Sequence, residues 1–209
     1  MNDFSELSVR EFLSALASPE PTPGGGTAAA IAGAMGAALA EMVGALTLSR
    51  EKFAPVHDAV RSIAEAAQRA REEFLVLARE DSEAYDAVVA ARRLAKETEE
   101  EMQVRARAIE SANRLATEVP MRTARAAARL LAALPELVEK GNPNALSDAG
   151  AAALVLSAAA EGALLNVGIN LPGISDAAFV EDMRREAAEI QAETQRLRLN
   201  ILAAVAKRF

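Results

Sequence analysis

Cysteine and tryptophan are absent from this chain of 209 residues, and histidine occurs only once, as His57. Without cysteine there is no disulfide, no thiolate nucleophile and no cysteine-based metal site. A single histidine excludes a histidine-rich metal site and gives little support to a Ser-His-Asp triad. We therefore expect no metal in this protein.

Large side chains are also scarce. Hydrophobic residues make up 51% of the chain, but much of that is alanine, and aromatic residues are only 3%. Such a core must be thin and closely packed, which favours helices lying near one another over a sheet. No segment shows the alternating pattern of a strand. We predict an all-α fold: one domain over residues 1–209, built as a bundle of seven or eight helices with two central Ala/Gly-rich helices.

Positively charged side chains are outnumbered by negatively charged ones, and the net charge is −7. No run of Lys or Arg exceeds two residues. An acidic chain repels phosphate backbones, so we expect no nucleic-acid partner. The start, MNDFSELSVREF, is acidic and polar, unlike a signal peptide, and the cytoplasm is the expected location. Residues 27–48 carry one charge, Glu41, over a length that could span a bilayer. Alanine and glycine give little insertion energy, so we expect a buried helix and no membrane.

Local signals set the expected helix boundaries. The sequences SVRE at 8–11 and TEEE at 98–101 are capping boxes. Thr27 and Ser175 are predicted N-caps of later helices. Pro120 is expected to kink or restart a helix. The predicted helices span about 9–17, 27–49, 55–94, 98–118, 120–140, 145–170 and 175–209.

The stretch PTPGGGT, which contains Gly24, Gly25 and Gly26, precedes one Ala/Gly-rich helix. Free N–H groups at such a helix start suit an anion. Gly24, Gly26 and Ala29 fit the spacing G-x-G-x-x-A, but a proline-rich loop replaces the required strand, so we reject a dinucleotide fold. A tight turn with close packing explains the glycines equally well, and both interpretations stay open.

The stretch GNPNALSDAG precedes the other Ala/Gly-rich helix. Asn144 is expected to cap this helix, and Ser147 and Asp148 lie in its first turn, where the dipole favours a carboxylate. These features alone describe an ordinary helix start. Further along the helix, Asn166 and Asn170 share one face of an apolar stretch. Burying them is unfavourable unless each finds a partner, which favours a polar cavity.

A third stretch, AREDSEAYD, places Asp81 four residues before Tyr85, the only tyrosine. This pair could line a pocket, because residues at this spacing share a helix face. A solvated acidic face is the simpler interpretation of the spacing alone.

The three stretches together resemble the cyclodeaminase domain of formiminotransferase-cyclodeaminase and its free-standing bacterial relatives, which include methenyltetrahydrofolate cyclohydrolases. The matching motifs occur in the family's order and cover most of the chain. They are FLSALASPEPTPGGGTAAAIAGAMGAALAEMV, EDSEAYDAV, EVP at 118–120, and GNPNALSDAGAAALVL followed by GALLNVGINL. There is no formiminotransferase portion, so the resemblance is to the cyclodeaminase domain alone.

This resemblance implies an all-helical enzyme that forms a homodimer or a higher homo-oligomer. Its substrate would be a tetrahydrofolate derivative, with no cofactor beyond that substrate. The expected activity is formimidoyltetrahydrofolate cyclodeaminase, which converts 5-formiminotetrahydrofolate to 5,10-methenyltetrahydrofolate and ammonia. The alternatives are a methenyltetrahydrofolate cyclohydrolase and a non-catalytic folate-binding or scaffold protein.

The resemblance also assigns roles to the residues already singled out. Asp148 is the first candidate for the acid/base, and Asp81 is the second. The substrate-binding candidates are Gly24, Gly25, Gly26, Asn144, Ser147, Asn166 and Asn170. We expect all of these groups to converge on one pterin-sized hollow. The glycine loop could bind either the glutamate carboxylates of folate or its reacting end. Arg50 and Lys52 are further candidates for the glutamate tail, although solvation explains them more simply.

Overall fold

The computed structural model describes residues 4–208, and within that range all regular structure is helical. The α-helices are α1 (Val9–Leu16), α2 (Gly25–Leu48), α3 (His57–Arg92), α4 (Glu99–Lys140), α5 (Leu146–Asn170) and α6 (Ala177–Ala206). Short 3-10 turns occur at Phe4–Glu6, Glu51–Val56, Pro143–Ala145 and Leu171–Gly173. The predicted all-α class is confirmed. The predicted count of seven or eight is wrong, because the described chain forms six α-helices.

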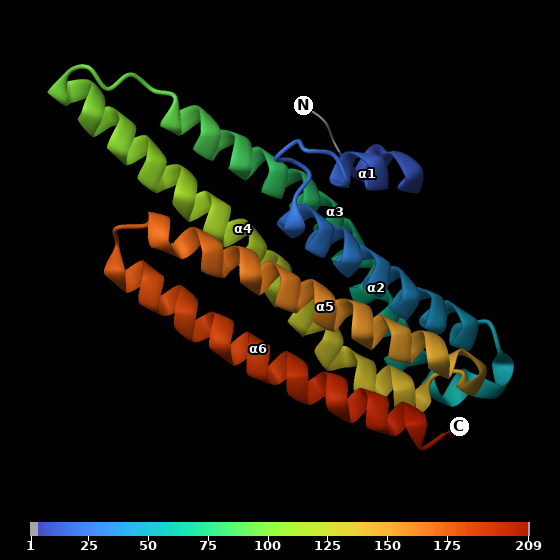
Figure 1. Ribbon diagram of the computed structural model, residues 1–209. Coiled ribbons are helices and arrows are strands. Elements are labelled where there is room, and N and C mark those ends of the chain that lie inside the picture. Colours follow the sequence, from blue (N-terminus) through green and yellow to red (C-terminus); the bar gives the residue numbers. More distant parts are fainter. Residues whose placement is uncertain (1–3, 209) are drawn as a thin grey trace.

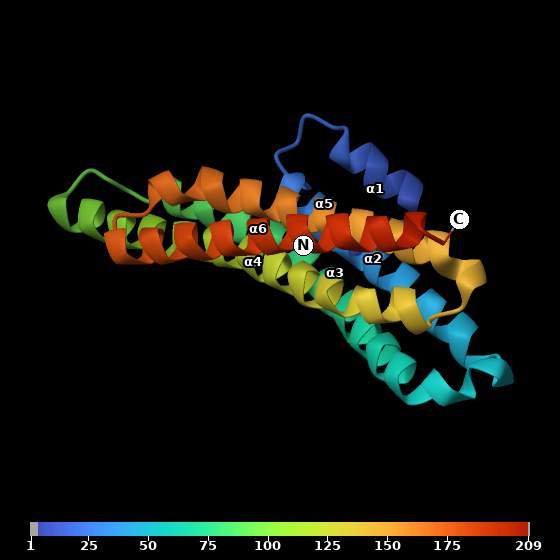
Figure 2. The same ribbon diagram turned by 90° about the horizontal axis from the view of Figure 1, so that it is seen from below.

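Four long helices form the bundle in the order α2, α3, α4, α5, with α5 closing against α2. Helix α6 packs along α4 and α5. Figures 1 and 2 show this elongated arrangement, with α1 standing apart on one side. The two Ala/Gly-rich helices, α2 and α5, run in opposite directions. The amino end of α2 therefore lies beside the carboxyl end of α5.

Small residues allow α2 to approach its neighbours closely. A Cβ atom added to Gly36 would lie 2.7 Å from Cγ of Leu156 on α5. A Cβ added to Gly33 would lie 2.6 Å from the ring of Phe74 on α3. Phe74 and Leu156 are completely buried. Burial of one such side chain contributes about 1.5–3 kcal/mol, so the glycines provide space for the main apolar contacts.

The two predicted capping boxes are confirmed. The Ser8 side chain accepts a hydrogen bond from the backbone of Glu11, and the Glu11 carboxylate accepts one from the backbone of Ser8. Thr98 and Glu101 make the same reciprocal pair at the start of α4. Each pair satisfies N–H groups that the first helical turn leaves free. Four residues of sequence were therefore enough to predict where α1 and α4 each begin.

The two other predicted N-caps, Thr27 and Ser175, are wrong. Helix α2 begins at Gly25 after an extended Gly24, so Thr27 lies within its first turn. Helix α6 is capped by Asp176, whose carboxylate accepts hydrogen bonds from the N–H groups of the second and third helical residues. Thr27 and Ser175 instead bond to side chains of other helices, which local sequence does not reveal.

Helix α4 continues through Pro120, so the predicted restart at this proline is wrong. A proline inside a helix removes the N–H that would bond to the carbonyl four residues earlier, here that of Ala116. Asn170 Nδ2 on α5 donates to this Ala116 oxygen at 2.6 Å. A side chain from a neighbouring helix thus satisfies the carbonyl, and α4 continues through Pro120.

Two helical segments are long and apolar enough to cross a bilayer by length and composition, namely Gly25–Leu48 and Pro143–Gly173. About half of the most apolar window of each is buried inside the bundle, 50% and 44% respectively. Core helices of water-soluble proteins pass the same test, so these two helices are weak evidence for a membrane span.

Candidate active site

A cleft of about 340 Å³ lies where the amino end of α2 meets the carboxyl end of α5. Helices α3 and α4 supply its remaining walls. The lining residues are Pro21, Thr22, Gly24, Gly25, Gly26, Asp81, Tyr85, Val88, Arg92, Asn113, Ala116, Asn166, Ile169 and Asn170. Residues far apart in the sequence thus meet here. The resemblance led us to expect this for all of the predicted site residues, and part of that set does line the cleft.

The predicted site residues fall into two groups. Six of them line the cleft: Gly24, Gly25, Gly26, Asp81, Asn166 and Asn170. The other three, Asn144, Ser147 and Asp148, lie at the opposite end of α5. Asp148 precedes Asn166 by five helical turns, or about 27 Å along the axis. Within one chain α5 therefore holds the two groups apart, so the predicted single hollow could form only with residues of a second copy.

The residues at the far end of α5 also differ from expectation in their local roles. Asn144 does not cap the helix; the Asn142 side chain accepts a hydrogen bond from the Asn144 N–H, and Ala145 occupies the N-cap of α5. Ser147 is exposed and Asp148 is partly exposed. Arg50 follows α2 at this same end, remote from the cleft.

Asp81 is held against the first turn of α2. Its Oδ2 accepts a hydrogen bond from the Thr27 hydroxyl at 2.8 Å. The Thr27 oxygen lies 3.1 Å from the hydroxyl of Ser82, and both hydroxyl-bearing residues are buried. The backbone N–H of Thr27 also favours the ionised form of the Asp81 carboxylate and lowers its pKa. The carboxylate therefore sits at a positively polarised helix end with a fixed orientation.

Gly26 has a steric reason to be glycine. A Cβ atom added there would lie 2.7 Å from Cγ of Asp81 and would overlap its carboxylate oxygens. A Cβ added to Gly25 would lie 3.4 Å from Nδ2 of Asn166, at the limit of ordinary contact. At Gly26, therefore, the absence of a side chain lets the backbone approach a carboxylate of the same protein.

Burial raises the pKa of Asp81 above its ordinary value, while the hydrogen bonds from Thr27 partly oppose that rise. Burial disfavours the charged form, whereas hydrogen bonds to the carboxylate favour it. A carboxyl group whose pKa is raised by burial is better suited than a solvated one to exchange protons with a bound substrate. Asp81 is the carboxylate that lines the cleft.

Three asparagine amides line the cleft and are anchored through the backbone. Asn166 donates to the carbonyl of Gly162 at 2.9 Å, and Asn170 donates to Ala116 as described above. Asn113, which the sequence analysis did not single out, donates to the carbonyl of Gly173 at 2.6 Å. Within residues 4–208, the side-chain oxygens of these three amides accept no hydrogen bond from the protein. They remain available as acceptors for a ligand.

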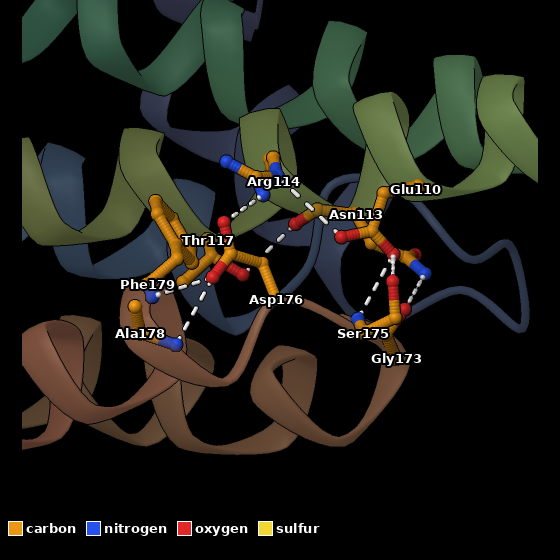
Figure 3. A network of polar contacts seen from close by, with 9 residues as sticks. All are labelled: Glu110, Asn113, Arg114, Thr117, Gly173, Ser175, Asp176, Ala178 and Phe179. Atoms are coloured by element: carbon orange, nitrogen blue, oxygen red, sulfur yellow. Dashed lines mark hydrogen bonds and ion pairs between the residues drawn. The ribbon is translucent and has the colours of Figure 1, made fainter.

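A polar network fixes the connection between α5 and α6 onto α4 (Figure 3). Its links are Asn113 to the Gly173 carbonyl at 2.6 Å, the Ser175 N–H and hydroxyl to Glu110 at 2.9 Å each, and Arg114 to Asp176 at 2.6 Å. The bonds from Ser175 lower the pKa of Glu110. Because this connection directly follows Asn170, the network holds the carboxyl end of α5 in place beside the cleft.

Comparison with known proteins establishes the family. The profile of the formiminotransferase-cyclodeaminase family matches residues 8–189. The chain belongs to this family. Its sequence is 40% identical over 198 residues to the methenyltetrahydrofolate cyclohydrolase of Methylorubrum extorquens, covering 95% of each chain. The motif-based resemblance is thereby confirmed.

Two further relatives define how much of the family the chain represents. The crystal structure of formiminotetrahydrofolate cyclodeaminase from Thermotoga maritima superposes with a TM-score of 0.86 at 33% identity, covering 97% of both chains. The formimidoyltransferase-cyclodeaminase of Rattus norvegicus is 35% identical over 192 residues, which are 91% of this chain but 36% of the rat protein. The chain thus spans about a third of that relative.

Proposed function

We propose that this chain is an enzyme of folate one-carbon metabolism that hydrolyses the 5,10-methenyl bridge of tetrahydrofolate, with Asp81 as the general base. One observation carries the proposal: a partly buried carboxylate with a raised pKa lies in a cleft beside three available amides. The 40% identity to a methenyltetrahydrofolate cyclohydrolase over nearly the full length supports this reaction. Cyclodeamination, which the sequence analysis placed first, becomes the second candidate.

In this reaction water attacks the methenyl carbon, and Asp81 accepts a proton from that water as the C–O bond forms. The bond from this carbon to N5 then breaks, leaving a formyl group on N10. One proton from the water ends on N5 and the other leaves to solvent, so Asp81 serves first as base and then as acid. General acid/base assistance of this kind contributes about 10²- to 10⁴-fold.

The amides would orient the substrate rather than take part in bond changes. A pterin ring carries several N–H groups, and the side-chain oxygens of Asn113, Asn166 and Asn170 can accept hydrogen bonds from them. The one-carbon unit keeps its oxidation state in this reaction. The proposal therefore includes no redox cofactor and no ligand beyond the folate derivative and water.

The similarity to the Thermotoga cyclodeaminase favours formimidoyltetrahydrofolate cyclodeaminase as the second candidate. Here N10 attacks the formimino carbon on N5, Asp81 removes the N10 proton, and protonation of the amine releases ammonia. The product is the 5,10-methenyl bridge. One carboxylate that both accepts and returns a proton serves either reaction, so the same cleft supports both.

The absorbance of methenyltetrahydrofolate tests the proposal with the purified full chain. Decay of the band above the buffer rate indicates the cyclohydrolase, whereas growth of the band from 5-formiminotetrahydrofolate indicates the cyclodeaminase. Asp81→Asn is expected to lower turnover by about 10²- to 10⁴-fold. Asp86→Asn is the control, because Asp86 is exposed on the same helix and does not line the cleft. Full turnover by Asp81→Asn, or no absorbance change with either substrate, would contradict the assignment.

The proposal includes a homodimer in which Asp148 serves the cleft of the other copy. Helix α5 exposes Leu154, Leu165 and Ile169, although it is apolar on all sides. Such a helix is normally covered on every face. A two-fold axis near Ala158 would pair α5 antiparallel with its copy. Residues 148 and 168 are equally distant from Ala158, so Asp148 of the partner subunit would lie opposite Gly168, next to Ile169 of this cleft.

Mixing two variants tests this shared site. Asp81→Asn and Asp148→Asn should each lose turnover, and co-refolding them should restore part of it, because heterodimers then contain one unaltered site. Leu165→Asp should yield monomers in sedimentation, because it places a charge in the contact. If Asp148→Asn keeps full turnover, or the mixture recovers nothing, each site uses residues of a single chain.

A further inference from the structure

The cleft is elongated along α3, and one stripe of that helix forms its floor. Asp81, Tyr85, Val88 and Arg92 all line it. Their spacing of four, three and four residues places them on a single face of the helix. Asp81 and Arg92 are three helical turns apart, roughly 16 Å along the axis. The cleft therefore has a carboxylate at one end, a guanidinium at the other and an aromatic ring between them.

Arg92 differs from the neighbouring arginines of the bundle. Arg122 pairs with Glu80, and Arg129 pairs with Glu73. In the part of the chain that the structure describes, the Arg92 side chain has no carboxylate within ion-pair distance, although Asp81 shares the cleft with it. Its backbone carbonyl, by contrast, accepts two hydrogen bonds from Arg105 at 3.1 and 3.3 Å. The end of α3 is thus fixed while the cationic group stays exposed and unpaired.

We propose that Arg92 binds a carboxylate of the glutamate portion of the folate substrate and that Tyr85 packs against the aminobenzoyl ring. This inference rests on the proposed function. Folate joins its pterin, its aminobenzoyl ring and its glutamate in that order, which matches the order Asp81, Tyr85, Arg92 along the cleft. A guanidinium pairs with a carboxylate through two parallel hydrogen bonds, and an aromatic ring offers a flat apolar surface.

This orientation assigns the glycine loop to the reacting end of the substrate. The first turn of α2 already directs the hydroxyl and N–H of Thr27 to the Asp81 carboxylate. A second carboxylate from the glutamate tail would be repelled there. Arg50 and Lys52, the earlier candidates for the tail, follow the other end of α2 and do not line this cleft within the chain.

Steady-state kinetics with two substrates tests the role of Arg92. The substrates are 5,10-methenyltetrahydrofolate and 5,10-methenyltetrahydropteroate, which lacks the glutamate. A hydrogen bond to a charged group contributes about 1.5–3 kcal/mol, so Arg92→Gln should raise KM for the folate about 10- to 100-fold. Its kcat should hold, because binding remote from the chemistry is equal in ground and transition states. For the pteroate, KM should be the same in Arg92→Gln and the unaltered enzyme.

Arg93→Gln is the matched control, because Arg93 is the exposed next residue and does not line the cleft. It should leave both KM values unchanged. Equal increases in KM for both substrates in Arg92→Gln, or equal effects of the two variants, would overturn the inference. Calorimetry with tetrahydrofolate and tetrahydropteroate repeats the comparison without turnover. If only the proposed reaction is wrong, Arg92→Gln should still weaken the binding of tetrahydrofolate and leave that of tetrahydropteroate unchanged. If the variant affects both ligands equally, the role of Arg92 is refuted.

Discussion

Gly26→Ala tests the close contact on which the candidate site depends. The added Cβ would lie 2.7 Å from Cγ of Asp81, and the Thr27 hydroxyl restrains the carboxylate from moving aside. Inserting a methyl group into such a packed region costs about 1–3 kcal/mol. Alanine regains up to about 1 kcal/mol of helix propensity, less in the first turn. We expect a net loss of about 1–2 kcal/mol in the free energy of unfolding.

For a chain of this size, each kcal/mol changes Tm by about 2–4 °C, so Gly26→Ala should lower Tm by about 2–8 °C. Turnover should fall further, by about 10²-fold, because a displacement of about 1 Å at a reacting group has an effect of that size. Gly150→Ala is the control for propensity alone, since a Cβ there would make only ordinary contacts with Val205, at 3.5 Å or more. It should leave Tm unchanged or raise it.

Thermal unfolding and the methenyl absorbance assay measure both effects. Replacing Asp81 with alanine in the Gly26→Ala background should reduce the stability loss, because the overlapping carboxylate is gone. Neighbouring groups that share one contact show this non-additivity in a double-mutant cycle. Unchanged Tm and turnover in Gly26→Ala, or strict additivity in the cycle, would refute the argument that Gly26 exists to accommodate Asp81.

Further predictions concern the same region. Burial raises the pKa of Asp81 in the folded protein above 3.8. As pH rises, this carboxyl therefore ionises in the unfolded chain before it ionises in the folded one. The free energy of unfolding consequently falls as pH rises through the interval above 3.8. Asp81→Asn should therefore gain stability over the unaltered protein from acidic to neutral pH in denaturant titrations. Asn113→Ala should lower the free energy of unfolding by about 1–3 kcal/mol, because it removes the partly buried hydrogen bond to the Gly173 carbonyl. Arg114→Ala should cost less, because its pairing with Asp176 is exposed to solvent, which screens the attraction. Chemical denaturation ranks the two, and a reversed order contradicts this argument.

Signals confined to a few residues predicted the structure well. The capping boxes at Ser8 and Thr98 depend only on side chains three residues away, and both are present. The all-helical class followed from composition, because small residues permit close helix packing and give sheets little to bury. The same property predicted that the two Ala/Gly-rich helices are central, and in the structure they pack against each other. Each of these predictions depends only on interactions within one helix or between two helices in direct contact.

The errors arise where a residue acts across the bundle. Thr27 has the side chain of an N-cap, but it bonds to Asp81, 54 residues later. Asp148 stays a prediction as an acid/base, but within one chain it lies at the far end of α5 from Asn166, because the sequence pattern does not specify the direction of α5. Arg92 could have been found, since it continues the stripe that begins at Asp81 and Tyr85. Asn113 carried no such signal, because one polar residue in an amphipathic helix is ordinary.

The relation between Pro120 and Asn170 explains why two separate motifs belong to one site. Any residue other than proline at position 120 would direct its N–H to the carbonyl of Ala116. That carbonyl would then hold the Asn170 amide less well, and the amide would have to find another partner or turn into the cleft. Because Pro120 leaves the carbonyl free, α4 fixes the last residue of α5 at 2.6 Å without interrupting either helix. The residue that sequence rules treat as a helix breaker thus orders a wall of the cleft.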